Sequence, residues 1–324
     1  MKKKVLIVQP IHESGMKVFD DRFEVKVASD PSVETVIREI EGVEGVIVRT
    51  APFTREIIEA ARSLRVIARH GVGVDNIDVK AATEHGILVL NTPDANAVSV
   101  AEHTIVAMGS LAKRVLSMDQ ATRAGQWEVR NEYKAVDLEG KVLGVVGLGR
   151  IGRMVARKAR AAFDMRVLGY DPYVSAEVAG QEGITLVSDL DEIFRSSDFV
   201  TLHTPLTPET KHLVNAARLA LMKPTAFLLN FSRGEVVDER ALYHALKSGL
   251  IAGAALDVFE QEPPAADNPL FTLPNVILSP HSAALTKECV VRMATGAAQG
   301  VVDVLTGVKP RYVVNPEVFE RLKP

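Results

Sequence analysis

A glycine-rich turn at 147–152, Gly-Leu-Gly-Arg-Ile-Gly, limits the possible folds of this chain more than any other feature. A short apolar run at 141–146 precedes the turn, and Asp171 ends a second such run about 20 residues later. Gly147 permits a tight strand-to-helix turn, Gly149 lets a pyrophosphate approach the backbone, and Gly152 lets the helix pack close to the strand. The phosphates would bind at the helix N-terminus, where N–H groups are unpaired. The pattern therefore predicts a dinucleotide-binding unit in a parallel α/β sheet.

The acidic residue at the end of the second run indicates which dinucleotide binds. A carboxylate at Asp171 accepts hydrogen bonds from ribose hydroxyls and repels a 2′-phosphate. No Arg or Lys occupies the next three positions, 172–174, where it could bind that phosphate. A bare glycine motif also occurs in ordinary turns, but here a strand, a helix and a correctly spaced acid accompany it. We expect NAD as the cofactor.

The bulk properties exclude several classes of protein. A chain of 324 residues favours two domains, and a net charge of −3 offers no basic footprint for nucleic acid or anionic membranes. The only cysteine is Cys289, which fits a reducing compartment. The N-terminal apolar run is too short for a signal peptide, and no Cys/His cluster has metal-ligand spacing. We expect a cytoplasmic protein without a metal, a nucleic-acid partner or a membrane segment.

Short apolar runs alternate with amphipathic stretches along almost the whole chain, which is typical of βαβ units. The runs of the first module lie at 5–8, 23–27, 45–48, 64–68 and 86–90. The runs of the second module lie at 142–146, 166–170, 199–203, 226–230, 252–258 and 275–279. The fold class is therefore α/β, with two Rossmann-like, doubly wound parallel-sheet domains.

Two long helical patterns set the expected domain organisation. Residues 97–124 contain few helix breakers and predict one long helix that joins the modules and ends at Gly125. A second pattern at about 286–306 ends at Gly307, and the tail 308–324 would return to the first module to be buried. We expect a discontinuous, flavodoxin-like substrate-binding domain from residues 1–98 plus 286–324, and an NAD-binding domain at 99–285.

Three polar residues follow strands of the second module, where ligands bind in open parallel sheets: Arg233, Glu262 and His281. Individually they are compatible with a surface arginine, a loop carboxylate and a structural histidine. Together they match hydride exchange with a 2-hydroxy acid. The arginine fork would bind the substrate carboxylate, the histidine would relay the hydroxyl proton, and the glutamate would orient the histidine and favour its protonated form.

These residues lie in segments that resemble the D-isomer specific 2-hydroxyacid dehydrogenase family, and within it the short-form D-3-phosphoglycerate dehydrogenases. The matching segments are 46–54, 69–93, 101–104, 147–152, 203–210, 230–242, 252–264 and 279–286. The resemblance implies that Arg233, Glu262 and His281 are catalytic. It implies a cofactor site formed by Gly147, Gly149, Arg150, Ile151, Gly152, Asp171, Thr204, Phe231, Ser232, Asp257 and Ala284. It implies a substrate site that includes Val72, Gly73 and Asn96.

Several features leave the substrate open. Arg49 and Arg69 follow strands of the first module and either bind a second anionic group of the substrate, such as phosphate, or pair with surface acids. His70 stands where phosphoglycerate enzymes often have a small residue, and 92–96 reads TPDAN instead of the commoner glycine-containing form. Serine feedback through a C-terminal sensing domain, as in long family members, is not expected.

Our first hypothesis for the substrate pair is 3-phosphoglycerate and phosphohydroxypyruvate, with hydroxypyruvate or glyoxylate reduction as the alternative. A non-enzymatic NAD-sensing scaffold and an enzyme like formate dehydrogenase are rival functions. Glu262 argues against the formate reaction, because its partner histidine would have no proton to relay. The complete catalytic trio argues against a scaffold. We also expect a homodimer with a contact through 97–124 and the segment after it.

Overall fold

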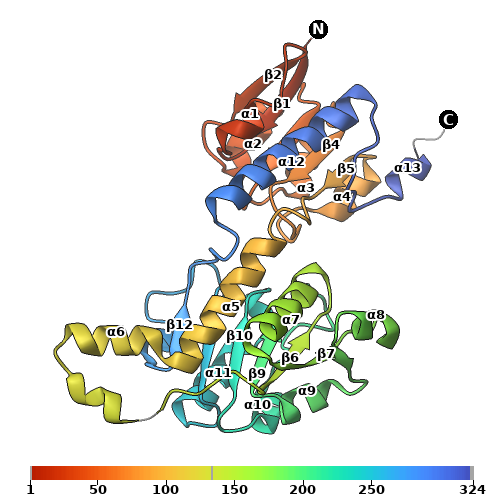
Figure 1. The fold of residues 1–324 in the computed structure, drawn as a ribbon. Helices are drawn as coiled ribbons and strands as arrows, with labels where there is room; N and C mark the ends of the chain where they lie inside the picture. The colour runs from red at the N-terminus through yellow and green to blue at the C-terminus, as the bar shows by residue number, and fades with distance from the viewer. Residues whose placement is uncertain (1, 133, 322–324) are drawn as a thin grey trace. The chain divides into compact units, whose positions relative to one another are not determined.

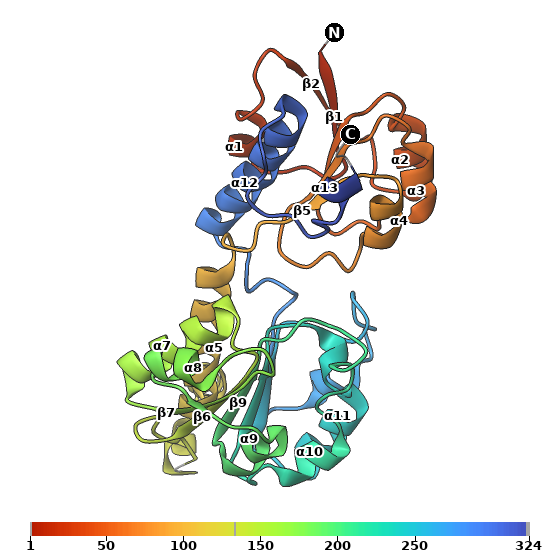
Figure 2. The same cartoon turned by 90° about the vertical axis from the view of Figure 1, so that its right-hand side faces the viewer.

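The computed structural model describes residues 2–132 and 134–321, which form two compact units (Figures 1 and 2). One unit comprises Met1–Asn96 and Leu285–Pro324, and the other comprises Ala97–Ala284. Each unit contains one all-parallel sheet with a hydrophobic core on each face. The fold class predicted from the alternating apolar runs is thus confirmed. Among the described residues, no helix is long and apolar enough to cross a membrane.

The first unit has a five-stranded sheet in the order β2-β1-β3-β4-β5. Its strands are β1 (Lys3–Ile7), β2 (Phe23–Val27), β3 (Gly45–Val48), β4 (Val66–Arg69) and β5 (Leu88–Leu90). Its helices are α1 (Glu13–Met16), α2 (Val33–Glu39), α3 (Arg55–Ala60), α4 (Val79–Glu84), α12 (Lys287–Thr306) and α13 (Val318–Arg321). Alternate strand residues face opposite cores: Ile67 packs with α2, α3 and α4, and Ala68 packs with α12.

The C-terminal segment completes this sheet. Helix α12 begins after its N-cap Thr286 and ends at Gly307, whose φ of 82° is left-handed. Beyond it, the buried side chain of Asn315 accepts a hydrogen bond from Val89 N (2.8 Å) and donates to Ile87 O (2.9 Å). Residues 313–315 of the tail thus lie against β5 of the first sheet.

The second unit has a seven-stranded sheet in the order β12-β11-β10-β9-β6-β7-β8. Its strands are β6 (Val142–Val146), β7 (Arg166–Tyr170), β8 (Thr185–Leu186), β9 (Phe199–Leu202), β10 (Phe227–Asn230), β11 (Gly253–Leu256) and β12 (Val276–Leu278). Its helices are α5 (Ala97–Lys113), α6 (Val115–Arg123), η1 (Trp127–Glu132), α7 (Arg150–Phe163), α8 (Ala176–Gln181), α9 (Leu190–Ser196), α10 (Ala216–Leu221), η2 (Gly234–Val236), α11 (Glu239–Lys247) and η3 (Pro269–Thr272). The strand order reverses between β6 and β9, and a parallel sheet binds its ligand at such a point.

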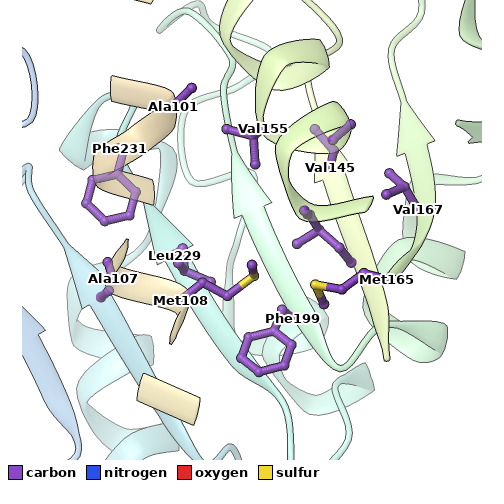
Figure 3. Close-up of a cluster of buried hydrophobic side chains, with 14 of the residues drawn as sticks. Ala101, Ala107, Met108, Val145, Val155, Met165, Val167, Phe199, Leu229 and Phe231 are labelled. Atoms are coloured by element: carbon purple, nitrogen blue, oxygen red, sulfur yellow. The ribbon is translucent and has the colours of Figure 1, made fainter. Parts of the chain in front are cut away.

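The core of this unit seats α5 on the sheet. Figure 3 shows Ala107 and Met108 of α5 near Leu229 of β10 and Phe199 of β9. Helix α7 packs on the same face through Val155. The small alanines let α5 lie close to β10 and β11.

The prediction of one helix over 97–124 is wrong. The chain forms α5 and α6 with a break at Arg114, whose φ of 54° and ψ of 35° are left-handed. A left-handed residue interrupts the run of helical hydrogen bonds. The carbonyl of Ala112, near the end of α5, accepts a hydrogen bond from the backbone N–H of Val136 (2.9 Å). Neither Gly nor Pro marks this position, so the sequence carries no signal for the break. The two-residue strand β8 was also not predicted.

Candidate active site

The turn between β6 and α7 has the geometry that its glycines predict. Gly147 has a φ of 91°, and a Cβ there would lie 2.6 Å from the carbonyl of His203. A Cβ on Gly152 would lie 2.0 Å from the carbonyl of Gly147, so neither position accepts a side chain. Gly149 is the N-cap of α7 and has open space where its Cβ would be. The turn leaves backbone N–H groups accessible to a phosphate at the start of a long helix.

Asp171 is held beside this turn at the end of β7. Its Oδ2 accepts from Leu148 N (2.8 Å), and its Oδ1 accepts from Tyr173 N (2.9 Å). These two bonds orient the carboxylate while leaving lone pairs on both oxygens for further donors.

The other predicted cofactor residues surround the same edge of the sheet. The hydroxyl of Thr204, just beyond β9, is buried without a hydrogen-bond partner among the described residues. The neighbouring His203 is buried, and burial lowers its pKa to about 3, so its imidazole is neutral. Phe231 is buried after β10 and meets the ring of His103 edge-on at 5.2 Å. Arg150 and Ile151 begin α7, Ser232 is buried beside Phe231, and Ala284 packs against the α5 core. An orphaned hydroxyl and a cradle of glycines fit a dinucleotide.

The three candidate catalytic residues come from three adjacent strands. Arg233 follows β10, Glu262 follows β11 and His281 follows β12. His281 Nδ1 lies 2.7 Å from Glu262 Oε2. Because a carboxylate only accepts, Nδ1 carries the proton and Nε2 is left to accept one. The parallel strand order thus brings Glu262 and His281 together, as expected.

Glu262 is oriented and ionised by its surroundings. Its second oxygen, Oε1, accepts from Phe259 N (3.1 Å). Burial raises the pKa of the Glu262 carboxyl, but the bonds from His281 and Phe259 and the positive charge of Arg233 outweigh burial and hold that pKa below its usual range. The carboxylate is therefore charged at neutral pH.

The turn that carries Arg233 depends on a residue that sequence analysis did not identify. The buried Asn230 accepts from Ser232 N (3.1 Å) and Ser232 Oγ (2.8 Å) and donates to the carbonyl of Arg233 (2.8 Å). The guanidinium donates to the carbonyl of Ser232 (2.7 Å). Asn230 ends an apolar strand run, and a polar residue at that point is the only signal that could have found it.

Asp257 holds the loop that carries His281. The residue is 2% exposed, and its carboxylate accepts from Ser279 Oγ, Ser282 N (2.8 Å) and Ala283 N (2.9 Å). Its carbonyl accepts from His281 N (2.7 Å), where the backbone is left-handed with a φ of 49°. These contacts explain why an acid stands there, and its place in the cofactor site stays a prediction.

The predicted substrate residues lie in the first unit, at the carboxyl ends of its strands. Arg49 follows β3 and donates to Pro10 O (2.9 Å), and Arg69 ends β4 and donates to His70 O. Val72, next to Gly73, accepts from Asn91 (2.9 Å), and Asn96 has a buried side-chain oxygen without a hydrogen-bond partner among the described residues. Burial, together with the charges of Arg49 and Arg69, lowers the pKa of His70 to about 4. Their part in binding the substrate remains a prediction.

Comparisons with known proteins point to one family of enzymes. The model of the family "D-isomer specific 2-hydroxyacid dehydrogenase, NAD binding domain" matches residues 105–283. The chain is 46% identical, over 99% of its length, to a D-3-phosphoglycerate dehydrogenase of Methanocaldococcus jannaschii, but it spans only 62% of that relative. It is 41% identical to a glyoxylate reductase of Korarchaeum cryptofilum, covering 99% of this chain and 98% of that one.

A solved structure of a related dehydrogenase has a similar fold. The D-lactate dehydrogenase of Aquifex aeolicus, complexed with NAD and lactic acid, superposes with a TM-score of 0.85 at 31% identity. The match covers 96% of this chain and 99% of that chain. The similarity therefore extends over both units of the fold.

Proposed function

Since this chain belongs to the D-isomer specific 2-hydroxyacid dehydrogenase family, we propose that it transfers a hydride between NAD and a small D-2-hydroxy acid. The observation that carries this proposal is the 2.7 Å contact between His281 and Glu262, one strand away from Arg233. NAD, held by the glycine turn, Asp171 and Thr204, supplies the acceptor or donor of hydride when it is bound.

The chain's own residues supply the rest of the reaction. Arg233 binds the substrate carboxylate and polarises the neighbouring C–O bond. His281 Nε2 takes the hydroxyl proton when the carbon gives up hydride, and it returns a proton to the carbonyl oxygen in the reverse direction. Glu262 accepts the Nδ1 proton, which fixes the tautomer and stabilises the imidazolium that forms. A formate reaction releases no hydroxyl proton, so it would not use the proton relay of His281 and Glu262.

We propose 3-phosphoglycerate and phosphohydroxypyruvate as the substrate pair, supported by the similarity to D-3-phosphoglycerate dehydrogenases and by Arg49 and Arg69 on neighbouring strands. The glyoxylate reductases, which this chain matches over their full length, favour glyoxylate or hydroxypyruvate as the second candidate. A steady-state assay of NADH oxidation with phosphohydroxypyruvate, hydroxypyruvate, glyoxylate and pyruvate decides between them. The highest kcat/KM for phosphohydroxypyruvate would support the first candidate, and the highest for glyoxylate would overturn it.

Replacing Asp171 should weaken the preference for NADH over NADPH. In the Asp171→Asn variant an amide replaces the charged acceptor, and charge-assisted hydrogen bonds contribute about 1.5–3 kcal/mol. The ratio of kcat/KM for NADH to that for NADPH should therefore fall about 10- to 100-fold. Asp171→Ala also removes the acceptor for Leu148 N and should lower the melting temperature. Comparing the two variants separates the effect on cofactor preference from the effect on stability. A wild-type preference for NADPH would contradict the assigned role.

Replacing Glu262 with glutamine should shift the pH profile of 2-keto acid reduction and not only its height. Reduction needs the imidazolium of His281, and the carboxylate that stabilises it is ionised because the pKa of Glu262 is lowered. Without that charge the imidazolium loses its proton at lower pH. The pH at which the rate falls to half should therefore be about one unit lower than in the wild type. Glu192→Gln, at an exposed glutamate of α9, is the matched control. An unshifted profile of lower height would contradict this assignment.

We also propose that the chain forms a homodimer through α5, α6 and η1. These elements carry exposed large apolar side chains, with Val106 67%, Leu116 51% and Trp127 63% exposed. Such a concentration marks an interaction surface, and two-fold pairing is the commonest closed assembly. Sedimentation at micromolar concentration should give a dimer for the wild type and a monomer for Leu116→Asp with Trp127→Asp. A monomeric wild type would contradict the proposal.

A further inference from the structure

The segment that carries Glu262 passes directly over the turn that carries Arg233. A Cβ on Gly234 would lie 1.9 Å from the carbonyl carbon of Phe259 and 2.5 Å from Glu260 N. Only glycine therefore allows the 259–260 peptide to cross there. Because Glu262 Oε1 accepts from Phe259 N, the direction of the Glu262 carboxylate depends on where this crossing lies.

A second histidine–carboxylate pair holds the same segment from outside. His212 Nε2 lies 2.9 Å from Glu260 Oε1, and Glu260 is two residues before Glu262. His212 belongs to the loop after β9, and its backbone N–H donates to the carbonyl of Glu235 (2.7 Å). The pair therefore ties the segment of Glu262 to the loop on the other side of η2.

The partners of Glu260 explain why a donor is needed there. Glu239 N donates to Glu260 Oε1 (3.2 Å), and Glu260 N donates to Glu239 Oε1. These reciprocal bonds bring two carboxylates close together, and like charges repel. Asn268 donates to Glu239 Oε2 (3.1 Å), and the imidazole of His212 donates to Glu260. The two donors offset the repulsion and close the cluster.

We propose that His212 is a positioning residue: acting through Glu260, it holds the 259–262 segment so that Glu262 stays within hydrogen-bond reach of His281. The inference rests on the proposed dehydrogenase function. It adds two residues, His212 and Glu260, whose side chains bond to none of the three groups assigned to the chemistry. Its consequence is that the Glu262–His281 pair loosens when the outer pair is removed.

Two variants remove the outer pair in different ways. Glu260→Ala removes the acceptor. His212→Asn shortens the side chain so that it no longer reaches Glu260. Asparagine suits the left-handed backbone at this position, where φ is 50°. Glu260→Gln keeps an oxygen acceptor for the imidazole and serves as the conservative variant. His244→Asn, at an exposed histidine of α11 in the same unit, is the matched control.

Glu260→Ala and His212→Asn should each lower kcat about ten- to hundredfold, as expected when a reacting group is displaced. Both should lower the pH at which the reductive rate falls to half, in the direction expected for Glu262→Gln. The KM for NADH should be unchanged. Glu260→Gln should retain most of the wild-type kcat, and His244→Asn all of it. An unchanged kcat and pH profile in both variants would overturn the proposal, and so would a lower melting temperature with an unshifted pH profile.

The pH midpoint of the His281 ring resonances, followed by NMR in the absence of substrate, provides a test without turnover. It should move to lower pH in Glu260→Ala and His212→Asn and stay in place in His244→Asn. An unmoved midpoint would refute the positioning role even in an active enzyme. If the wild type reduces none of the four acids, the proposed function fails, and the same midpoints still decide whether the outer pair positions Glu262.

Discussion

His281→Ala is expected to lower the rate of 2-keto acid reduction by about 10²–10⁴-fold, because this is the usual contribution of a positioned acid–base group. NADH binding should be nearly unchanged, since the glycine turn and Asp171 lie on other strands of the sheet. The measurement is kcat by NADH oxidation together with NADH affinity by fluorescence titration.

A second substitution separates chemistry from backbone effects at this position. The φ of His281 is 49°, a left-handed conformation that asparagine adopts more readily than alanine. His281→Asn should therefore be at least as stable as His281→Ala and equally inactive. Unchanged turnover in either variant would remove the proton relay. Bound NADH without turnover in the wild type would favour the non-enzymatic scaffold.

Arg233→Ala is expected to lower kcat/KM for the keto acid about 30- to 5,000-fold, corresponding to the roughly 2–5 kcal/mol lost when one partner of a charged pair is removed. In the proposed mechanism one guanidinium serves both the carboxylate and the reacting carbonyl, so kcat should fall and KM should rise. Arg233→Lys keeps the charge but not the two-pronged fork and should lie between wild type and alanine.

The control for Arg233 is NADH affinity, which should change little in both variants. The hydrogen bond from Asn230 goes to the Arg233 carbonyl, so the turn keeps its shape when the side chain changes. A loss confined to KM would mean that Arg233 binds the carboxylate without polarising the carbonyl.

The part of the second sheet that carries the candidate catalytic residues could be predicted because it depends on local patterns and on one topological rule. Apolar runs located β10, β11 and β12, and the carboxyl ends of parallel strands meet at the same edge. Polar residues that follow such strands, here Arg233, Glu262 and His281, are therefore brought to the same end of the sheet, and this does not depend on a particular loop conformation. The contact of Glu262 with His281 is a direct outcome of this arrangement.

Features that depend on contacts between distant segments could not be predicted. The break at Arg114 has no Gly or Pro to mark it. The role of Asp257 in holding the loop at 279–283 could not be predicted, because its three donors lie far from it in the sequence. The pair of His212 and Glu260 joins two loops whose separation in sequence gives no spacing signal.

The first sheet is closed by helix α12 and Asn315, and this order of elements affects how the chain folds during synthesis. Strands β1 to β5 leave the ribosome first, but the helix that covers Ile47 and Ala68 follows only after the whole second unit. At about 5–20 residues per second, roughly 200 intervening residues take about 10–40 s. During that interval one apolar face of the sheet is open to chaperones, and the nucleotide-binding unit gains its last strand, β12, before α12 is made. The unit that begins first is therefore completed last.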